Sequence, residues 1–295
     1  MAKERLAIIV ATKDRHEDLR RLFNSILLQD TRPEQIIVVD GGDVPVLPVI
    51  EEFKDLAVSY VRKMPASLTA QRNAGIRMLS GDITLAAFLD DDIILEDGSL
   101  RRMVEFFESS SADVAAASFN NMGDRYKRAN LAEKIFLVNA DVPGRIMRSG
   151  FQSKLCSLDA DTAVEWLVGC AMLYRRGIFA EFMFDEWFAG YARYEDVDFS
   201  YRVGKRYRMY VVAGAKVRHP NRPEDLSFSR KLGEMEVINR LYFVKKNKDL
   251  SVPLCYWALF GILLNNILKG VLLLNKRNRL RAAGNIAGLA RSLTR

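Results

Sequence analysis

Short apolar runs rich in β-branched residues recur along the first half of the chain, and polar segments with helical spacing separate several of them. The runs lie at residues 6–12, 34–42, 57–62, 83–92 and 112–119. Continuous apolar runs of this length are typical of strands that are buried on both faces. Because such strands alternate with helices, the sequence predicts a doubly wound α/β fold with a mostly parallel sheet.

The loop after the first predicted strand, ATKDRHED, contains no glycine. A dinucleotide-binding Rossmann domain would carry a G-x-G-x-x-G loop there, so this class is disfavoured. The chain of 295 residues is 49% hydrophobic and 27% charged, which is ordinary for a globular protein with a substantial core. Its three cysteines show no metal-ligand spacing, and its charged first residues do not resemble a signal peptide. We therefore predict a cytoplasmic protein.

Positive charge is concentrated at the C-terminus. The formal net charge is +7, and residues 251–295 contain seven of the 44 basic residues but no Asp or Glu. Without these seven, 37 basic residues remain and equal the 37 acidic ones. A neutral body argues against nucleic acid as a partner, whereas the basic tail predicts contact with an anionic surface such as a membrane.

Three consecutive aspartates, Asp90, Asp91 and Asp92, end the fourth of these runs. In an open α/β sheet, ligands bind outside the carboxyl ends of the strands, where Asp90 and Asp40 are expected. Side chains alternate along an extended segment, so Asp90 and Asp92 should share a face while Asp91 points away. Two converging carboxylates suit a hard cation that bridges to a diphosphate, although a solvated acidic loop would explain the same residues.

Seven segments occur in a characteristic order: IIVATKDR, IIVVDGG, AQRNAGIRMLSGDI, FLDDDI, WLVGCAMLYRR, FDEWFAGYARYEDVDFSYRV and VRHP. Together they resemble the family-2 inverting glycosyltransferases of the GT-A fold, of the bacterial polysaccharide and glycoconjugate type, over residues 5–245. The resemblance implies an αβα sandwich, Mn²⁺ or Mg²⁺ as cofactor, and a nucleotide-diphosphate sugar as donor. A UDP-sugar is the preferred donor, and dTDP- and GDP-sugars stay open.

The resemblance also implies which side chains contact the donor: Thr12, Arg15, Asp40, Arg72, Asn73, Asp90, Asp91 and Trp166. Thr12 and Arg15 would line the base pocket, and Asp40 would contact the base. Arg72 would meet the nucleotide or its phosphates, which suits its fixed positive charge. Asp90 would hold the ribose, and Asp91 would support its neighbours.

The resemblance also implies that the segment YEDVDF contains the catalytic residues. An inverting transfer needs a base that deprotonates the acceptor hydroxyl as it attacks the anomeric carbon. The resemblance places this base at Asp196, with Glu195 as the second candidate, and the adjacent acids would raise its pKa. The metal ligands would be Asp92, Asp90 and His219, because two carboxylates and a neutral imidazole suit Mn²⁺ or Mg²⁺.

Several of these residues also have an ordinary structural explanation. Asp40 precedes two glycines and suits a turn, and Arg72 suits an exposed helix face. Acids at the start of YEDVDF suit the first turn of a helix, where they complement its dipole. His219 could equally be bonded to backbone, and Trp166 could equally belong to the core.

The C-terminal segment joins an apolar stretch to a basic one. Residues 252–274 are about long enough to cross a bilayer. Two asparagines and Lys269 lie within this stretch, where a lysine is costly in hydrocarbon. Because the following segment, 275–295, is basic and amphipathic, we favour helices that lie in the membrane interface, with a subunit interface and a true span as the alternatives.

We therefore predict a GT-A domain at 1–248 and a C-terminal helical membrane-interface appendage at 249–295. Within the domain, 1–119 would be the nucleotide-binding half and 120–248 the acceptor and catalytic half. The predicted activity is metal-dependent, inverting sugar transfer to a hydroxyl of a glycan or lipid-linked acceptor, in a peripheral protein at the inner face of the cell membrane. A nucleotidyltransferase of similar fold is one alternative, disfavoured by the glycine-free first loop. A non-catalytic nucleotide-binding scaffold is the other, disfavoured by the intact acidic motifs.

Overall fold

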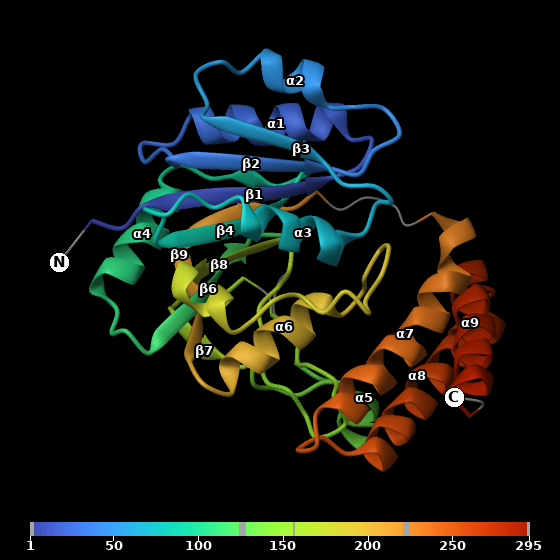
Figure 1. Ribbon diagram of the computed structural model, residues 1–295. Coiled ribbons are helices and arrows are strands. Elements are labelled where there is room, and N and C mark those ends of the chain that lie inside the picture. The colour runs from blue at the N-terminus through green and yellow to red at the C-terminus, as the bar shows by residue number, and fades with distance from the viewer. Residues whose placement is uncertain (1–2, 124–127, 156, 221–224, 294–295) are drawn as a thin grey trace. The chain divides into compact units, whose positions relative to one another are not determined.

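The computed structural model describes residues 3–123, 128–155, 157–220 and 225–293 (Figure 1). The chain forms two compact units. The first unit comprises Met1–Tyr126 and Leu155–Pro220, and the second comprises Lys127–Lys154 and Asn221–Arg295. The domain boundaries expected from the sequence, after residues 119 and 248, stay predictions.

A nine-stranded sheet lies at the centre of the first unit, within the described residues. Its strand order is β3-β2-β1-β4-β8-β6-β9-β5, and β7 pairs with β9. The strands are β1 Leu6–Thr12, β2 Gln35–Asp40, β3 Val58–Arg62, β4 Leu85–Asp90, β5 Ile94–Leu95, β6 Val114–Asn121, β7 Thr162–Val164, β8 Ala171–Arg175 and β9 Arg208–Arg218.

The predicted α/β fold is confirmed, and the sheet is mixed. Strand β1 runs parallel to β2 and β4, β2 runs parallel to β3, and β6 runs parallel to β9. Strand β8 is antiparallel to both of its neighbours, β4 and β6. The short strands β5 and β7 are each antiparallel to β9. A parallel block that contains β1, β2 and β4 therefore provides the carboxyl-end edge on which the predicted site depends.

Helices cover both faces of this sheet, as an αβα sandwich requires. Ile8 and Val10 of β1 pack in one core with α1, α2 and α4, whereas Ala7 and Ile9 pack in a second core with α3 and α6. Figure 1 shows α1 and α2 on one side of the sheet and α3 and α6 on the other. These elements are α1 His16–Leu27, α2 Leu47–Glu51, α3 Leu68–Arg77, α4 Ser99–Ser109, the 3₁₀ helix η1 Arg176–Ala180 and α6 Glu195–Gly204.

The segment 163–176 has the apolar composition of a single strand, but the structure divides it into β7 and β8 with a loop between them. Side chains of α6 satisfy part of the backbone of this loop. Ser200 Oγ accepts a hydrogen bond from the N–H of Leu167 at 3.1 Å, and Asp196 Oδ2 accepts one from the N–H of Gly169 at 2.9 Å. The loop escaped detection because Leu167 and its neighbours are buried and apolar, as in a strand.

The second unit is helical in its described residues. Its helices are α5 Leu131–Ile135, α7 Leu226–Lys246, α8 Val252–Leu272 and α9 Lys276–Leu293. Gly284 and Gly288 lie one turn apart on α9, and a Cβ at either would clash with α7, at Arg230 and Val237 respectively. Small residues at this spacing let the two helix backbones approach closely.

Buried asparagines connect the last three helices. Asn266 of α8 donates to Asn285 Oδ1 of α9 at 2.9 Å, and Asn278 donates to Asn266 Oδ1 at 2.9 Å. Asn285 in turn donates to the carbonyl oxygen of Gly233 in α7 at 2.8 Å. Among the described helices, α8 alone is long and apolar enough to cross a membrane by length and composition, and 33% of its most apolar stretch is buried.

Candidate active site

The carboxyl ends of three neighbouring strands bring the first predicted residues together. Thr12 ends β1, and its register partner Asp40 ends β2. Asp90 ends β4 and pairs in register with Ala11. Because these strands run parallel, their last residues lie at one edge of the sheet, which is where open α/β sheets bind ligands.

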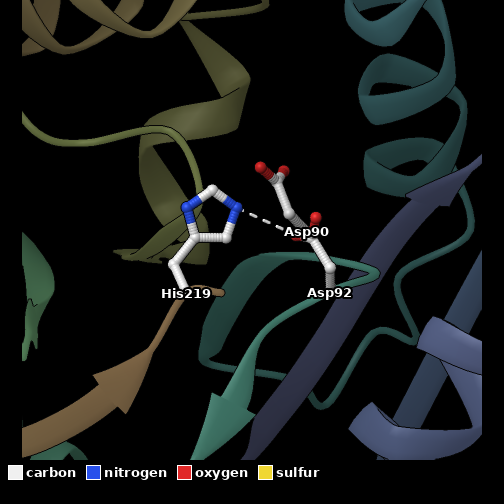
Figure 2. Close-up of side chains that lie close together, drawn as sticks. All are labelled: Asp90, Asp92 and His219. Atoms are coloured by element: carbon white, nitrogen blue, oxygen red, sulfur yellow. Dashed lines mark hydrogen bonds and ion pairs between the residues drawn. The ribbon is translucent and has the colours of Figure 1, made fainter. Parts of the chain in front are cut away.

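Asp90 and Asp92 lie close to His219, which follows β9 directly. One ligand atom from each of the three lies within 4.8 Å of the others. Figure 2 shows the imidazole beside the two carboxylates, and His219 Nε2 is 3.0 Å from Asp92 Oδ1. This hydrogen bond raises the pKa of His219 above its ordinary value. Two carboxylates and one imidazole are a donor set that suits Mn²⁺ or Mg²⁺, so the three predicted ligands fit a divalent cation.

Asp91 lies with Asp92 in a turn, so the side-chain alternation expected of an extended segment does not hold at these residues. Asp91 Oδ2 accepts a hydrogen bond from Thr12 Oγ1 at 2.7 Å, and Asp91 Oδ1 accepts one from Arg15 at 3.0 Å. Arg15 also donates to Asp92 Oδ2 at 2.9 Å. Burial raises the pKa of Asp91 to about 7, and the charge of Arg15 opposes this rise. Thr12 and Arg15 therefore fix the orientation of the triple-aspartate turn.

Arg72, in α3, is a buried connector between two acidic groups. Its guanidinium donates to Asp90 Oδ1 at 3.2 Å, to Glu195 Oε1 at 2.6 Å and to the carbonyl oxygen of Gly169 at 2.8 Å. The side chain is only 3% exposed, and the guanidinium carbon lies 5.3 Å from the centre of the Phe184 ring. Its contact with the donor phosphates stays a prediction. The observed contacts link the predicted metal ligands to the start of α6.

Glu195 and Asp196 begin α6 in different surroundings. Glu195 is buried, and its Oε2 has no hydrogen-bond partner within the described part of the chain. Burial raises the pKa of Glu195 to about 8, and the charge of Arg72 opposes this rise. Asp196 is half-buried, and its Oδ2 accepts the N–H of Gly169 at 2.9 Å. Of the two carboxylates, Asp196 is therefore the one with access to solvent and to a ligand.

Gly169 is a residue of this site that the sequence analysis did not single out. Its carbonyl contacts Arg72 and its N–H contacts Asp196. A Cβ at this position would lie 2.8 Å from Asp196 Cβ and 3.1 Å from Asp196 Oδ2, closer than ordinary side-chain contacts. Only glycine leaves this space free. Its signal in the sequence is a glycine inside the otherwise apolar segment WLVGCAMLYRR.

Asp40 stabilises the turn that follows β2. The carboxylate is fully buried and accepts hydrogen bonds from the N–H of Gly42 at 2.7 Å, the N–H of Val46 at 3.1 Å and the Tyr60 hydroxyl at 2.8 Å. These contacts agree with the structural explanation of an aspartate before two glycines. Its contact with a nucleotide base stays a prediction.

Asn73 and Trp166 also lie apart from the cluster of acids. Asn73 donates to the carbonyl of Phe184 and accepts the N–H of the same residue, both at 2.9 Å. It thereby fixes the segment that leads into α6. Trp166 is 7% exposed, in the loop that also contains Gly169. These positions do not test the predicted contacts of Asn73 and Trp166 with the donor, which stay predictions.

The fold and the site together define a class of protein. That class is the nucleotide-sugar glycosyltransferases of the GT-A fold. Comparison with known families specifies this further, because residues 7–183 match the model of glycosyl transferase family 2. The chain belongs to this family, and the predicted resemblance is confirmed.

Known relatives agree with this assignment. The chain is 26% identical over 238 residues to the uncharacterized glycosyltransferase YwdF of Bacillus subtilis (strain 168), and the match covers 77% of this chain and 80% of the relative.

Two solved structures show the same fold. One is the mannosyltransferase PcManGT from Pyrobaculum calidifontis in complex with GDP-Man and Mn²⁺, with a TM-score of 0.58 and 13% identity over 98% of this chain and 76% of that one. The other is GalNAc-T7 with UDP, GalNAc and Mn²⁺, with a TM-score of 0.57 and 13% identity over 87% of this chain and 55% of that one. At this identity, the likeness concerns the fold.

Proposed function

We propose that this protein catalyses a metal-dependent, inverting transfer of a sugar from a nucleotide-diphosphate sugar to a hydroxyl of a glycan or lipid-linked acceptor. The observation that carries the proposal is the Arg72 bridge. Arg72 bonds Asp90 on one side and both Glu195 and Gly169 on the other, and Gly169 in turn bonds Asp196. One hydrogen-bonded network therefore connects the carboxylates proposed to face the donor with the carboxylate proposed to face the acceptor, which supports the proposal.

Asp90, Asp92 and His219 would hold a Mn²⁺ or Mg²⁺ ion in this proposal. When bound, such a cation offsets the charge of the donor diphosphate and stabilises the nucleoside diphosphate that leaves. Both structural neighbours were solved with Mn²⁺, which supports this choice. A UDP-sugar is the proposed donor, with dTDP- and GDP-sugars as the other members of the same chemical class.

Asp196 is the proposed general base. Its hydrogen bond from the Gly169 N–H fixes one oxygen, and its partial exposure leaves the carboxylate within reach of an acceptor hydroxyl. The carboxylate would take the hydroxyl proton as the acceptor oxygen attacks the anomeric carbon from the face opposite the nucleotide. Because the bond forms on that opposite face, the sugar changes its anomeric configuration.

We further propose that the reaction takes place at the inner face of the cell membrane. The acid-free and basic segment 251–295 suits an anionic lipid surface. A peripheral position there would bring the enzyme to an acceptor that is linked to lipid.

Donor binding tests the proposed metal. Titration calorimetry with a panel of nucleotide sugars and Mn²⁺ should show binding that a chelator abolishes. Asp92→Asn should weaken binding in the same way without unfolding the protein, because it removes one charged ligand but keeps the size of the side chain. Asp30→Asn is a matched control, since Asp30 is a half-exposed partner of Arg101 outside the site. Sugar transfer at the wild-type rate without metal would contradict the proposal.

A further inference from the structure

One face of α8 carries large apolar side chains that the second unit leaves exposed. The opposite face, which includes Cys255, Ala258, Leu259 and Asn266, is buried at helical spacing. The side chains on the exposed face are between 40% and 73% exposed, and they are Trp257, Phe260, Ile267, Leu268, Val271 and Leu272. The outer face of a helix in a soluble protein is normally polar, so a continuous apolar face marks a surface that meets a partner.

Helix α5 extends this apolar face, although it lies 122 residues earlier in the sequence than its contact on α8. Trp257 Nε1 donates to the carbonyl oxygen of Ile135 at 2.9 Å, and the Phe136 ring lies 4.9 Å from the Trp257 ring. Leu131 and Ile135 are 74% and 53% exposed. We call these two residues, together with the six exposed residues of α8, the α5–α8 surface.

The buried face of α8 is not available to lipid, because its asparagine is already paired. Asn266 bonds both Asn285 and Asn278 of α9, and Asn285 bonds the carbonyl oxygen of Gly233 in α7. If α8 left these helices to cross a bilayer, its amide would lose both partners and would enter hydrocarbon, which is costly. Only the outer face of α8 is therefore suited to contact a membrane.

Basic side chains lie at both ends of α8. The segment 251–293 contains no Asp or Glu. The residues just before it, 245–250, contain one acid, Asp249. A helix of 21 residues is about 30 Å long, so the two basic groups are well separated. The head groups of an anionic membrane would neutralise both groups while the apolar face between them enters the acyl boundary. The basic residues are Lys245, Lys246 and Lys248 before α8 and Lys269, Lys276, Arg277 and Arg279 near its end.

We propose that the α5–α8 surface docks the protein onto one leaflet of an anionic membrane, with α8 lying in the plane of the interface and α5 beside it. This inference rests on the proposed membrane location and specifies its surface, depth and mode. The C-terminal segment is thus only part of the membrane contact, since the insertion that contains α5 supplies the rest.

A second copy of this chain suits the surface less well than a membrane does. Two-fold pairing places the same face of each copy against the other. Because both ends of α8 are basic, a parallel pairing and an antiparallel pairing would both bring like charges together, which opposes self-association.

Co-sedimentation of the full-length chain with phosphatidylcholine vesicles, with and without phosphatidylglycerol, tests the proposal. Leu131→Ser with Ile135→Ser in α5, and Phe260→Ser with Leu268→Ser in α8, should each lower partition onto anionic vesicles by about tenfold or more, because several buried methylene groups are lost. Leu28→Ser changes a leucine of the first unit that is 77% exposed, and it should leave partition unchanged. Release of nucleoside diphosphate from the donor should persist in every variant, which separates lost docking from a failure of the proposed function.

Two outcomes of this experiment would overturn the proposal. If the α5 pair of substitutions leaves vesicle binding unchanged while the α8 pair abolishes it, the tail docks alone. If the wild-type chain ignores vesicles and sediments as a dimer that the α8 substitutions dissociate, the surface is an interface between two copies.

Trp257 reports the depth of docking directly. It lies on the α5–α8 surface, Trp166 is buried, and Trp187→Phe removes the fluorescence of the third tryptophan. Lipids that carry a quencher near the head group should quench Trp257 more strongly than lipids with a quencher at the end of the acyl chain. Stronger quenching from the bilayer centre would place Trp257 deeper than the interface and would contradict the in-plane arrangement.

Discussion

Glu195 and Asp196 are adjacent in sequence, but the fold gives them different chemistry. Glu195 is bonded to Arg72 in the interior, where burial raises its pKa to about 8. Arg72 and Glu195 therefore act together as a support that holds the loop at Gly169 and the carboxylate of Asp90. Asp196 is oriented by the same loop through the Gly169 N–H, yet it stays accessible. We interpret Glu195 as a positioning residue and Asp196 as the base.

Substitution of each acid by its amide tests this assignment. Asp196→Asn removes the proton acceptor but keeps the size of the side chain, so turnover should fall by about 10²–10⁴-fold, the usual contribution of a positioned base. Glu195→Gln should lose less, because an amide oxygen can still accept from Arg72. Steady-state kinetics measure both effects, and calorimetric titration with nucleoside diphosphate and Mn²⁺ should show unchanged donor affinity for Asp196→Asn.

The same pair of variants can refute the assignment. Normal turnover in Asp196→Asn together with an inactive Glu195→Gln would move the base to Glu195. Activity in both variants would mean that the base lies elsewhere and that YEDVDF is only a helix start. Asp113→Asn, at an exposed aspartate of the same unit, controls for general effects of charge removal.

Gly169→Ala tests the close packing of this loop against the base. The added Cβ would lie 2.8 Å from Asp196 Cβ, so the loop or the carboxylate must shift by a fraction of an ångström. Small displacements of reacting groups cost up to about 10²-fold in rate, and we expect turnover to fall by about 10- to 10²-fold with little change in donor affinity. Gly177→Ala is the matched control, because a Cβ there meets nothing within 4 Å. Equal kinetics for the two alanine variants would remove the proposed role of Gly169.

Local rules predict some of these residues and miss others. Asp90 and Asp92 were predicted because the end of a buried strand is a local property, and His219 was predicted through the family resemblance. The pairing of Arg72 with Glu195 joins residues 123 positions apart, and no local pattern reports it. The partners of Asn73 were missed for a related reason, and for Asp40 the turn was only one of two explanations, since a buried polar side chain in a motif gives no sign of whether it meets backbone or ligand.

At the scale of whole elements, β1, β2, β4 and β6 were predictable because each is a nearly continuous buried run. The directions of the strands in the sheet were harder to predict. Strand β8 lies antiparallel between β4 and β6, and a run that is buried on both faces has the same composition in either direction. The division of segment 163–176 was also hidden, because its loop obtains hydrogen bonds from α6 and needs no polar turn residues of its own.

The asparagine contacts between α7, α8 and α9 should contribute measurably to stability. Asn285→Ala would leave the Asn266 amide and the Gly233 carbonyl without a shared partner, and an unsatisfied buried group costs about 1–3 kcal/mol. We expect the free energy of unfolding, measured by urea denaturation, to fall by that amount. Asn265→Ala, on the exposed side of α8, should change it little. Equal stability of the two variants would show that these contacts do not hold the three helices together.

At the scale of the whole molecule, the net charge of the chain is distributed unevenly along the sequence. Residues 1–250 contain equal numbers of acidic and basic side chains, whereas segment 251–295 contains seven basic residues and no acidic one. In the candidate site, Arg15 bonds Asp91 and Asp92, and Arg72 bonds Asp90 and Glu195. The net charge of +7 therefore belongs to the segment that we propose to meet the membrane, and donor chemistry and docking should respond differently to salt.

Changing the ionic strength distinguishes membrane docking from donor chemistry without any mutation. Raising the salt from about 0.1 M to 1 M shortens the Debye length from about 10 Å to about 3 Å, which screens exposed charges but affects buried pairs much less. Binding to anionic vesicles should weaken, and transfer to a lipid-linked acceptor in those vesicles should fall in parallel. Release of nucleoside diphosphate with a soluble acceptor should change little, and neutral vesicles should show little dependence of binding on salt. Transfer to the lipid-linked acceptor that persists at high salt, while vesicle binding is lost, would mean that the enzyme reaches its acceptor without docking on anionic lipid.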